Sequence, residues 1–66
     1  MNLKEIKEAV DKGYNVYWKS NIYKVIKDSN NEYLILCVPN NSVIGLTYKN
    51  NITLNGDEKD FHYTRD

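Results

Sequence analysis

The sequence has few of the residues that hold small proteins together through covalent or metal bonds. Its 66 residues include one cysteine, Cys37, and one histidine, His62. An internal disulfide is therefore impossible, and the usual cysteine–histidine zinc site cannot form. A chain of this length buries only about 60% of the surface that its unfolded form exposes. Association between subunits is the remaining common source of stability, so we expect a homo-oligomer of one domain, residues 1–66.

The net charge is zero, because nine basic side chains balance nine acidic ones. This balance argues against strong binding to nucleic acid and against an acidic mimic of DNA. No apolar run reaches membrane-spanning length, and the chain begins with a charged amphipathic pattern instead of a signal peptide. We therefore expect a cytoplasmic protein without membrane contact, which also suits an unpaired cysteine.

Asparagine pairs recur at a step of ten residues. The pairs are Asn30-Asn31, Asn40-Asn41 and Asn50-Asn51, and Ser20-Asn21 stands one step earlier. Asparagine tolerates left-handed backbone and bonds its own main chain, so it favours turns. Turn signals at this spacing, with apolar and aromatic runs between them, predict short antiparallel strands.

Residues 2–12 carry the signals of a helix at both ends. Asn2 and Glu5 have the spacing of a capping box, and Gly13 is a suitable left-handed terminator. Apolar side chains recur at helical spacing within the segment. A helix of about three turns is not stable alone in water, so its apolar stripe should pack on a sheet.

The remaining runs predict the fold class α+β: one N-terminal helix packed on a curved antiparallel meander of four to five strands. Partial closure into a small barrel is left open. The run 33–38 is apolar at successive positions, which predicts a central strand covered on both faces. Gly45 leaves one face bare, either for a bulge or for a group that approaches the backbone. The expected strands are 14–19, 22–27, 33–38, 42–48, 52–54 and 61–64.

Catalytic and metal-binding patterns are weak. Cys37, His62 and Asp60 can be written as a nucleophile, a base and an orienting acid, but Cys37 stands within an apolar run where cysteine behaves as a small buried hydrophobe. Asp57 and Glu58 belong to a charged loop that lacks the spacing of a calcium site. We therefore expect no enzyme, no metal and no cofactor.

One hairpin imitates a surface for single-stranded nucleic acid, because aromatic and basic side chains alternate along it. The simpler interpretation is a half-exposed hairpin whose lysines protect an edge. Because the net charge is zero, nucleic acid remains a secondary hypothesis. The residues are Tyr17, Lys19, Tyr23, Lys24 and Lys27.

Aromatic residues are unusually numerous for so short a chain: six tyrosines, Trp18 and Phe61. Tyrosine and tryptophan combine a large apolar body with one polar tip, so they are common at interfaces and in ligand pockets. Tyrosine is also an ordinary strand residue, and packing alone is an equal explanation. For a planar polar ligand, the predicted pocket residues are Tyr17, Trp18, Tyr23, Asn41, Thr47 and Asn55.

Several short segments, spread over most of the chain, also carry a resemblance. They are Ile6-Lys7-Glu8-Ala9, Val16-Tyr17-Trp18, Tyr23-Lys24-Val25-Ile26-Lys27-Asp28, Ile44-Gly45-Leu46-Thr47 and Leu54-Asn55-Gly56 with Asp60-Phe61. In these the chain resembles a group of short, uncharacterised proteins encoded by tailed phages and prophages of low-GC bacteria. The resemblance implies a context and no specific activity. Small phage proteins often block host factors, and some small oligomers sequester nucleotide signals of antiviral defence.

Three functions follow as hypotheses. The first is a non-enzymatic phage protein that sequesters a small nucleotide-derived ligand, a defence signal. The second is an inhibitor that binds a host enzyme through an edge strand or a tyrosine-rich face. The third is a weak binder of single-stranded nucleic acid, whose affinity would fall steeply with salt.

Overall fold

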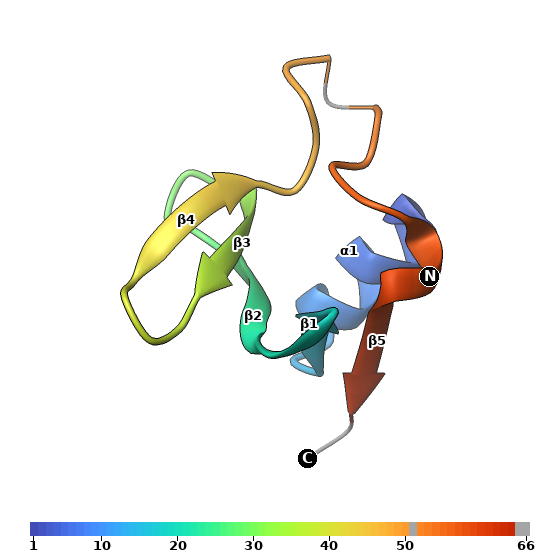
Figure 1. Cartoon of the computed structure of the whole chain (residues 1–66). Coiled ribbons are helices and arrows are strands. Elements are labelled where there is room, and N and C mark those ends of the chain that lie inside the picture. Colours follow the sequence, from blue (N-terminus) through green and yellow to red (C-terminus); the bar gives the residue numbers. More distant parts are fainter. Residues whose placement is uncertain (51, 65–66) are drawn as a thin grey trace.

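One helix lies on one face of a five-stranded antiparallel sheet (Figure 1). The computed structural model describes residues 1–50 and 52–64, so Asn51 of the third asparagine pair lies outside the described residues. The predicted α+β class is confirmed. The elements are α1 (Leu3–Asp11), β1 (Asn15–Trp18), β2 (Ser20–Lys27), β3 (Tyr33–Cys37), β4 (Ser42–Gly45), a short 3-10 helix η1 (Glu58–Asp60) and β5 (Phe61–Thr64).

Helix α1 begins and ends as predicted. The Asn2 side chain accepts a bond from the Glu5 backbone N–H at 2.8 Å, and the Glu5 carboxylate accepts one from the Asn2 N–H at 2.9 Å. These bonds satisfy two donors at the helix start. Gly13 follows the helix with φ +87°. Across the described residues, no helix combines the length and apolar character needed to cross a membrane.

Two of the predicted asparagine turns are confirmed. Asn31 and Asn41 both have left-handed backbone, with φ of 64° and 58°. The Ser20-Asn21 turn is wrong, because both residues belong to β2. A bulge after Tyr17 pairs Trp18 with Ser20, so Lys19 alone makes this turn, with φ 65°.

The strand order is β4-β3-β2-β1-β5. The first four strands form the predicted meander, but β5 returns to pair with β1 and does not continue it. The partly closed barrel is wrong, since β4 and β5 are the two separate edges of an open sheet. The chain after β4 turns inward instead, and Leu46 joins the same core as Phe61 at the start of β5.

The predicted strands 42–48 and 52–54 are shorter than expected. Strand β4 ends at Gly45, and the later segment contributes only an isolated bridge between Thr47 and Leu54. The backbone of the chain itself approaches the bare position at Gly45, because a Cβ there would lie 3.0 Å from the Thr47 carbonyl oxygen. The Asn55 side-chain amide donates to the Gly45 carbonyl at 3.2 Å. The loop is thereby held against the end of β4.

The core lies between α1 and one face of the sheet. Its buried side chains come from the helix, from β1 to β3, from the turn after β4 and from β5. Burial of each large apolar side chain contributes roughly 1.5–3 kcal/mol. The buried residues are Ile6, Ala9, Val16, Val25, Ile35, Leu46 and Phe61.

Two glycines give a matched test of packing around Trp18. A Cβ at Gly56 would lie 2.7 Å from Trp18 Nε1, whereas a Cβ at Gly13 would meet nothing within 4 Å. Both have positive φ. We expect Gly13→Ala to cost about 1–2 kcal/mol of unfolding free energy, the penalty for left-handed backbone. Gly56→Ala should cost about 1–3 kcal/mol more, because it also overpacks the ring.

Urea unfolding of the two variants measures this difference. Equal losses of stability in both would contradict the tight fit of Gly56 against Trp18.

Candidate functional site

The sheet separates the first two predicted pocket residues. Trp18 pairs with Phe61 and points to the core side, whereas Tyr17 pairs with His62 on the opposite face. The Tyr17 and His62 rings lie 5.7 Å apart. Because neighbouring residues of a strand alternate between faces, one pocket cannot use both side chains.

Trp18 is enclosed by its own chain. Its ring meets Tyr23 edge-on at 5.2 Å, lies against Phe61 at 6.3 Å, and is covered by Gly56. Its Nε1 atom is buried and has no hydrogen-bond partner within the described residues. Trp18 and Tyr23 thus act as packing residues at the end of the core.

The other three predicted residues hold loops in place. The Asn55 backbone N–H donates to the Leu46 carbonyl at 2.8 Å, and Thr47 forms the bridge to Leu54. Asn41 lies in the β3–β4 turn, at the edge of the sheet away from β1. The structure therefore brings Trp18, Tyr23 and the segment next to Asn55 together, and leaves Tyr17 and Asn41 apart.

A hollow of about 610 Å³ lies where α1 faces the β2–β3 turn and the chain that follows β4. This volume is within the range of roughly 300–1,000 Å³ found for ligand sites. Of the predicted pocket residues, only Thr47 lines it. The lining residues that could contact a ligand are Lys7, Asn31, Glu32, Tyr33, Thr47, Tyr48 and Lys49.

Charged groups in this hollow are not neutralised by one another. Among residues 1–50 and 52–64, the sole ion pair joins Lys27 Nζ to Asp11 Oδ1 at 3.2 Å. Lys7 and Lys49 therefore present ammonium groups, and Glu32 a carboxylate, without ion-pair partners in that part of the chain. The Lys7 ammonium lies 5.2 Å from the centre of the Tyr33 ring, and the Tyr48 side chain is 56% exposed.

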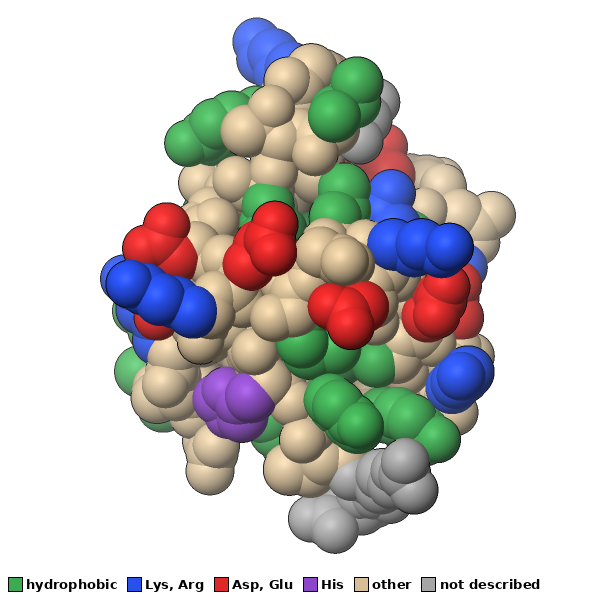
Figure 2. All heavy atoms as spheres, turned by 90° about the vertical axis from the view of Figure 1, so that its right-hand side faces the viewer, with side chains coloured by type: hydrophobic (Ala, Val, Ile, Leu, Met, Phe, Trp, Pro, Cys, Tyr) green, Lys and Arg blue, Asp and Glu red, His purple; other side chains and the backbone are tan. Residues whose placement is uncertain are grey.

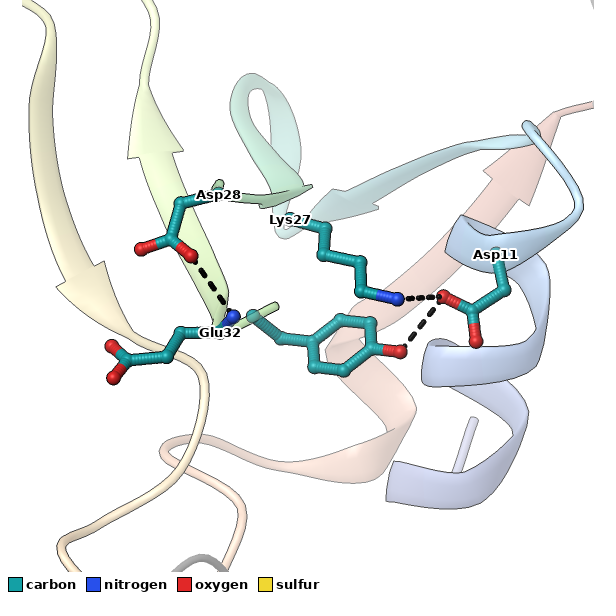
Figure 3. A network of polar contacts seen from close by, with 5 residues as sticks. Asp11, Lys27, Asp28 and Glu32 are labelled. Carbon is teal, nitrogen blue, oxygen red and sulfur yellow. Dashed lines mark hydrogen bonds and ion pairs between the residues drawn. The ribbon is translucent and has the colours of Figure 1, made fainter. Parts of the chain in front are cut away.

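A polar network fixes the wall of the hollow (Figure 3). The Tyr33 hydroxyl donates to Asp11 Oδ1 at 2.7 Å, and Lys27 Nζ donates to the same oxygen at 3.2 Å. The bond from Tyr33 lowers the pKa of the Asp11 carboxyl, and Lys27 adds to this effect. The same bond raises the pKa of Tyr33. Asp28 meanwhile accepts the Asn30 and Glu32 backbone N–H groups at 2.8 and 2.9 Å, which shapes the turn.

The sequence missed six of the seven residues that could contact a ligand, because they meet only after folding. Lys7 comes from α1, Tyr33 begins β3, and Tyr48 and Lys49 follow β4. The one signal available was the aromatic–basic pair Tyr48-Lys49 beside a turn at Asn50. No sequence pattern links that pair to a helix some forty residues earlier.

The catalytic grouping considered from the sequence is not assembled. Cys37 is on β3 and His62 is on β5, with β2 and β1 between them. Neighbouring strands are about 4.8 Å apart, so the two side chains cannot share a proton. In the described part of the chain, no group of three metal-ligating side chains comes together.

The hairpin that imitates a nucleic-acid surface is divided between two faces. Tyr17 and Lys24 lie on one face, whereas Tyr23 packs against the core on the other. Aromatic and basic groups therefore do not form one continuous groove along β1 and β2.

The face of the sheet away from α1, here called the outer face, is strongly apolar. Register places Lys24 beside Leu36, Ile26 beside Leu34, and Leu36 beside Val43. None of these side chains belongs to the core or packs against it. On β3, Ile35 is buried whereas Leu34 and Leu36 are half-buried, so the expected cover on both faces is found only in part. The outer face is apolar over β2 to β4 and more polar over β1 and β5, and it comprises Asn15, Tyr17, Ile22, Lys24, Ile26, Leu34, Leu36, Val43, Gly45, His62 and Thr64.

The side of the molecule that carries α1 and β5 looks different (Figure 2). Acidic side chains form a row across its middle, with basic side chains near both ends. None of the five strands contains an acidic residue.

No protein-family model, curated protein or solved structure matches this chain.

Removal of the Tyr33 hydroxyl should change the titration of Asp11. A carboxyl whose pKa is lowered on folding adds stability above its unfolded pKa and loses it as the pH falls through its folded pKa. In Tyr33→Phe we expect the Asp11 pKa to rise toward its ordinary value, so that acidification lowers stability less than in wild type. Carboxyl carbon shifts followed by NMR against pH measure the change.

The control for this titration is Tyr17→Phe, because Tyr17 lies on the outer face and leaves the bond to Asp11 intact. An Asp11 titration that is the same in Tyr33→Phe and wild type would show that the hydrogen bond is not formed in solution.

Proposed function

We propose that this protein is a non-enzymatic binding protein that sequesters a small nucleotide-derived ligand in the hollow beside α1. One observation carries the proposal: the hollow combines an exposed tyrosine ring with two ammonium groups and one carboxylate that lack ion-pair partners among the described residues. Few small molecules other than nucleotides offer a planar ring, anionic groups and amino donors together.

Each group of the hollow has a role in such a complex. The Tyr48 ring gives a stacking surface for a base, an interaction worth roughly 1–3 kcal/mol. Lys7, on α1, and Lys49, in the chain after β4, can neutralise a phosphate. Glu32 can accept hydrogen bonds from the amino group of a base. Thr47 adds a hydroxyl that donates and accepts.

The proposed site keeps the ligand class expected from the sequence and changes its residues. Thr47 is the one member of the earlier set that lines the hollow. Sequestration requires affinity and no chemical step, which agrees with a site built from binding groups. The resemblance to phage proteins supplies the proposed context, capture of a nucleotide signal of antiviral defence.

Thermal melting with a panel of nucleoside phosphates tests the proposal. A ligand at about 100 times its dissociation constant adds about 2.7 kcal/mol to the unfolding free energy. For a domain of this size, that corresponds to a rise of roughly 10 °C or more in Tm. Tyr48→Leu should weaken binding about ten-fold or more. Lys49→Gln should weaken it most at low salt, where charge is least screened.

Two matched variants serve as controls. Tyr17→Leu makes the same change on the outer face, and Lys59→Gln removes a lysine from η1; both should bind like wild type. No rise in Tm with any member of the panel would count against the proposal. Equal weakening by Tyr17→Leu and Tyr48→Leu would place the site elsewhere.

A further inference from the structure

The outer face presents a surface that a soluble sheet normally covers. Of its aliphatic side chains, Ile22 is 46% exposed and Val43 is 50% exposed, and Val38, which follows β3, is 48% exposed. The Val38 N–H donates to the Ile22 carbonyl at 2.8 Å, so the two residues lie side by side. Contiguous apolar patches of this kind mark interaction surfaces.

Helix α1 cannot cover this surface. It contacts β1 and β2 from the core side, and the β3–β4 hairpin extends away from it (Figure 1). The loop after β4 packs toward Leu46 and the core. Any cover for the outer face must therefore come from outside the described chain.

We infer that the outer face binds the outer face of a second copy of this chain, so that two sheets pack face to face about a two-fold axis. A stable interface needs about 800 Å² from each partner, less than a fifth of the 4568 Å² that this chain exposes. The extents of 30 × 25 × 23 Å are nearly equal. One side of the molecule therefore has about the area required.

The small core favours a second copy over an unrelated partner. Seven residues are buried among those described, and a chain of this length is marginally stable by itself. The folded chain therefore gains stability whenever its outer face is covered. A second copy of the chain is available wherever the chain is made, whereas another protein need not be.

The charge on the outer face is compatible with this pairing. Lys24 is the basic side chain of that face, on the middle strand β2, and its long aliphatic stem lets the ammonium group reach solvent. No strand carries an acidic residue that this arrangement would bury unpaired.

This inference does not rest on the proposed ligand site. The hollow shares Leu34 and Gly45 with the outer face, where β3 begins and β4 ends, and Thr47, Tyr48 and Lys49 continue it beyond the sheet. Ile22, Val38 and Val43 lie at the other end of the same strands. The effect of a Val43 substitution on dimer formation and the effect of a Tyr48 substitution on ligand binding can therefore be measured independently.

The oligomeric state measured by light scattering and sedimentation tests the inference. At micromolar to hundred-micromolar concentrations, wild type should have twice the 7.8 kDa mass of the chain. Val43→Asp should raise the dimer dissociation constant about 100-fold or more, because it buries an unpaired charge. The matched control is Ile52→Asp, at a loop position that is 77% exposed, and it should remain dimeric.

Two further readouts separate loss of the dimer from loss of the fold. Val43→Asp should keep the circular dichroism spectrum of wild type. On dilution of wild type, amide shifts should change at Ile22, Leu36 and Val43 and stay constant in α1. A monomeric wild type would overturn the inference, whether or not it binds another protein through Val43. A dimer that Val43→Asp leaves intact would overturn it as well.

Discussion

A single nine-residue helix can bury only one face of a sheet, and this constraint organises the molecule. Helix α1 contacts β1 and β2, and the core collects on that side. The side chains that alternate to the other face, Leu34 and Leu36 among them, are only half-buried and do not belong to the core or pack against it. Burial of apolar area is the main favourable contribution to folding. Covering the outer face would therefore add to the stability that the core provides.

The same limited cover creates the hollow. Beside α1, Leu46 enters the core, and its N–H donates to the Tyr33 carbonyl at 3.1 Å. Lys7, Tyr48 and Lys49 surround the hollow. The hollow and the outer face therefore have one origin, a sheet larger than its helix. The first supports capture of a small ligand, and the second supports pairing of two copies.

Local features were predictable from the sequence because they depend on neighbouring residues. The capping box at Asn2 and Glu5, the glycine after α1 and the left-handed Asn31 and Asn41 are of this kind. Pairing of β5 with β1 depends on where Phe61 is buried, which is a tertiary effect. The predicted pocket failed at Tyr17 and Trp18, because a count of aromatic residues does not say which face each one occupies. Lys7 and Lys49 meet only through the fold.

Solvent access to methyl groups tests the one-sided core most directly. Relaxation caused by a soluble gadolinium chelate can be measured by NMR for the methyl groups of Leu34, Leu36 and Val43, and for those of Val25 and Ile35, in a sample dilute enough to be monomeric. The account predicts the strongest relaxation at Val43, which is 50% exposed, intermediate relaxation at the half-buried Leu34 and Leu36, and weak relaxation at Val25 and Ile35, which are 3% and 1% exposed. Equal protection of both groups in the monomer would contradict it.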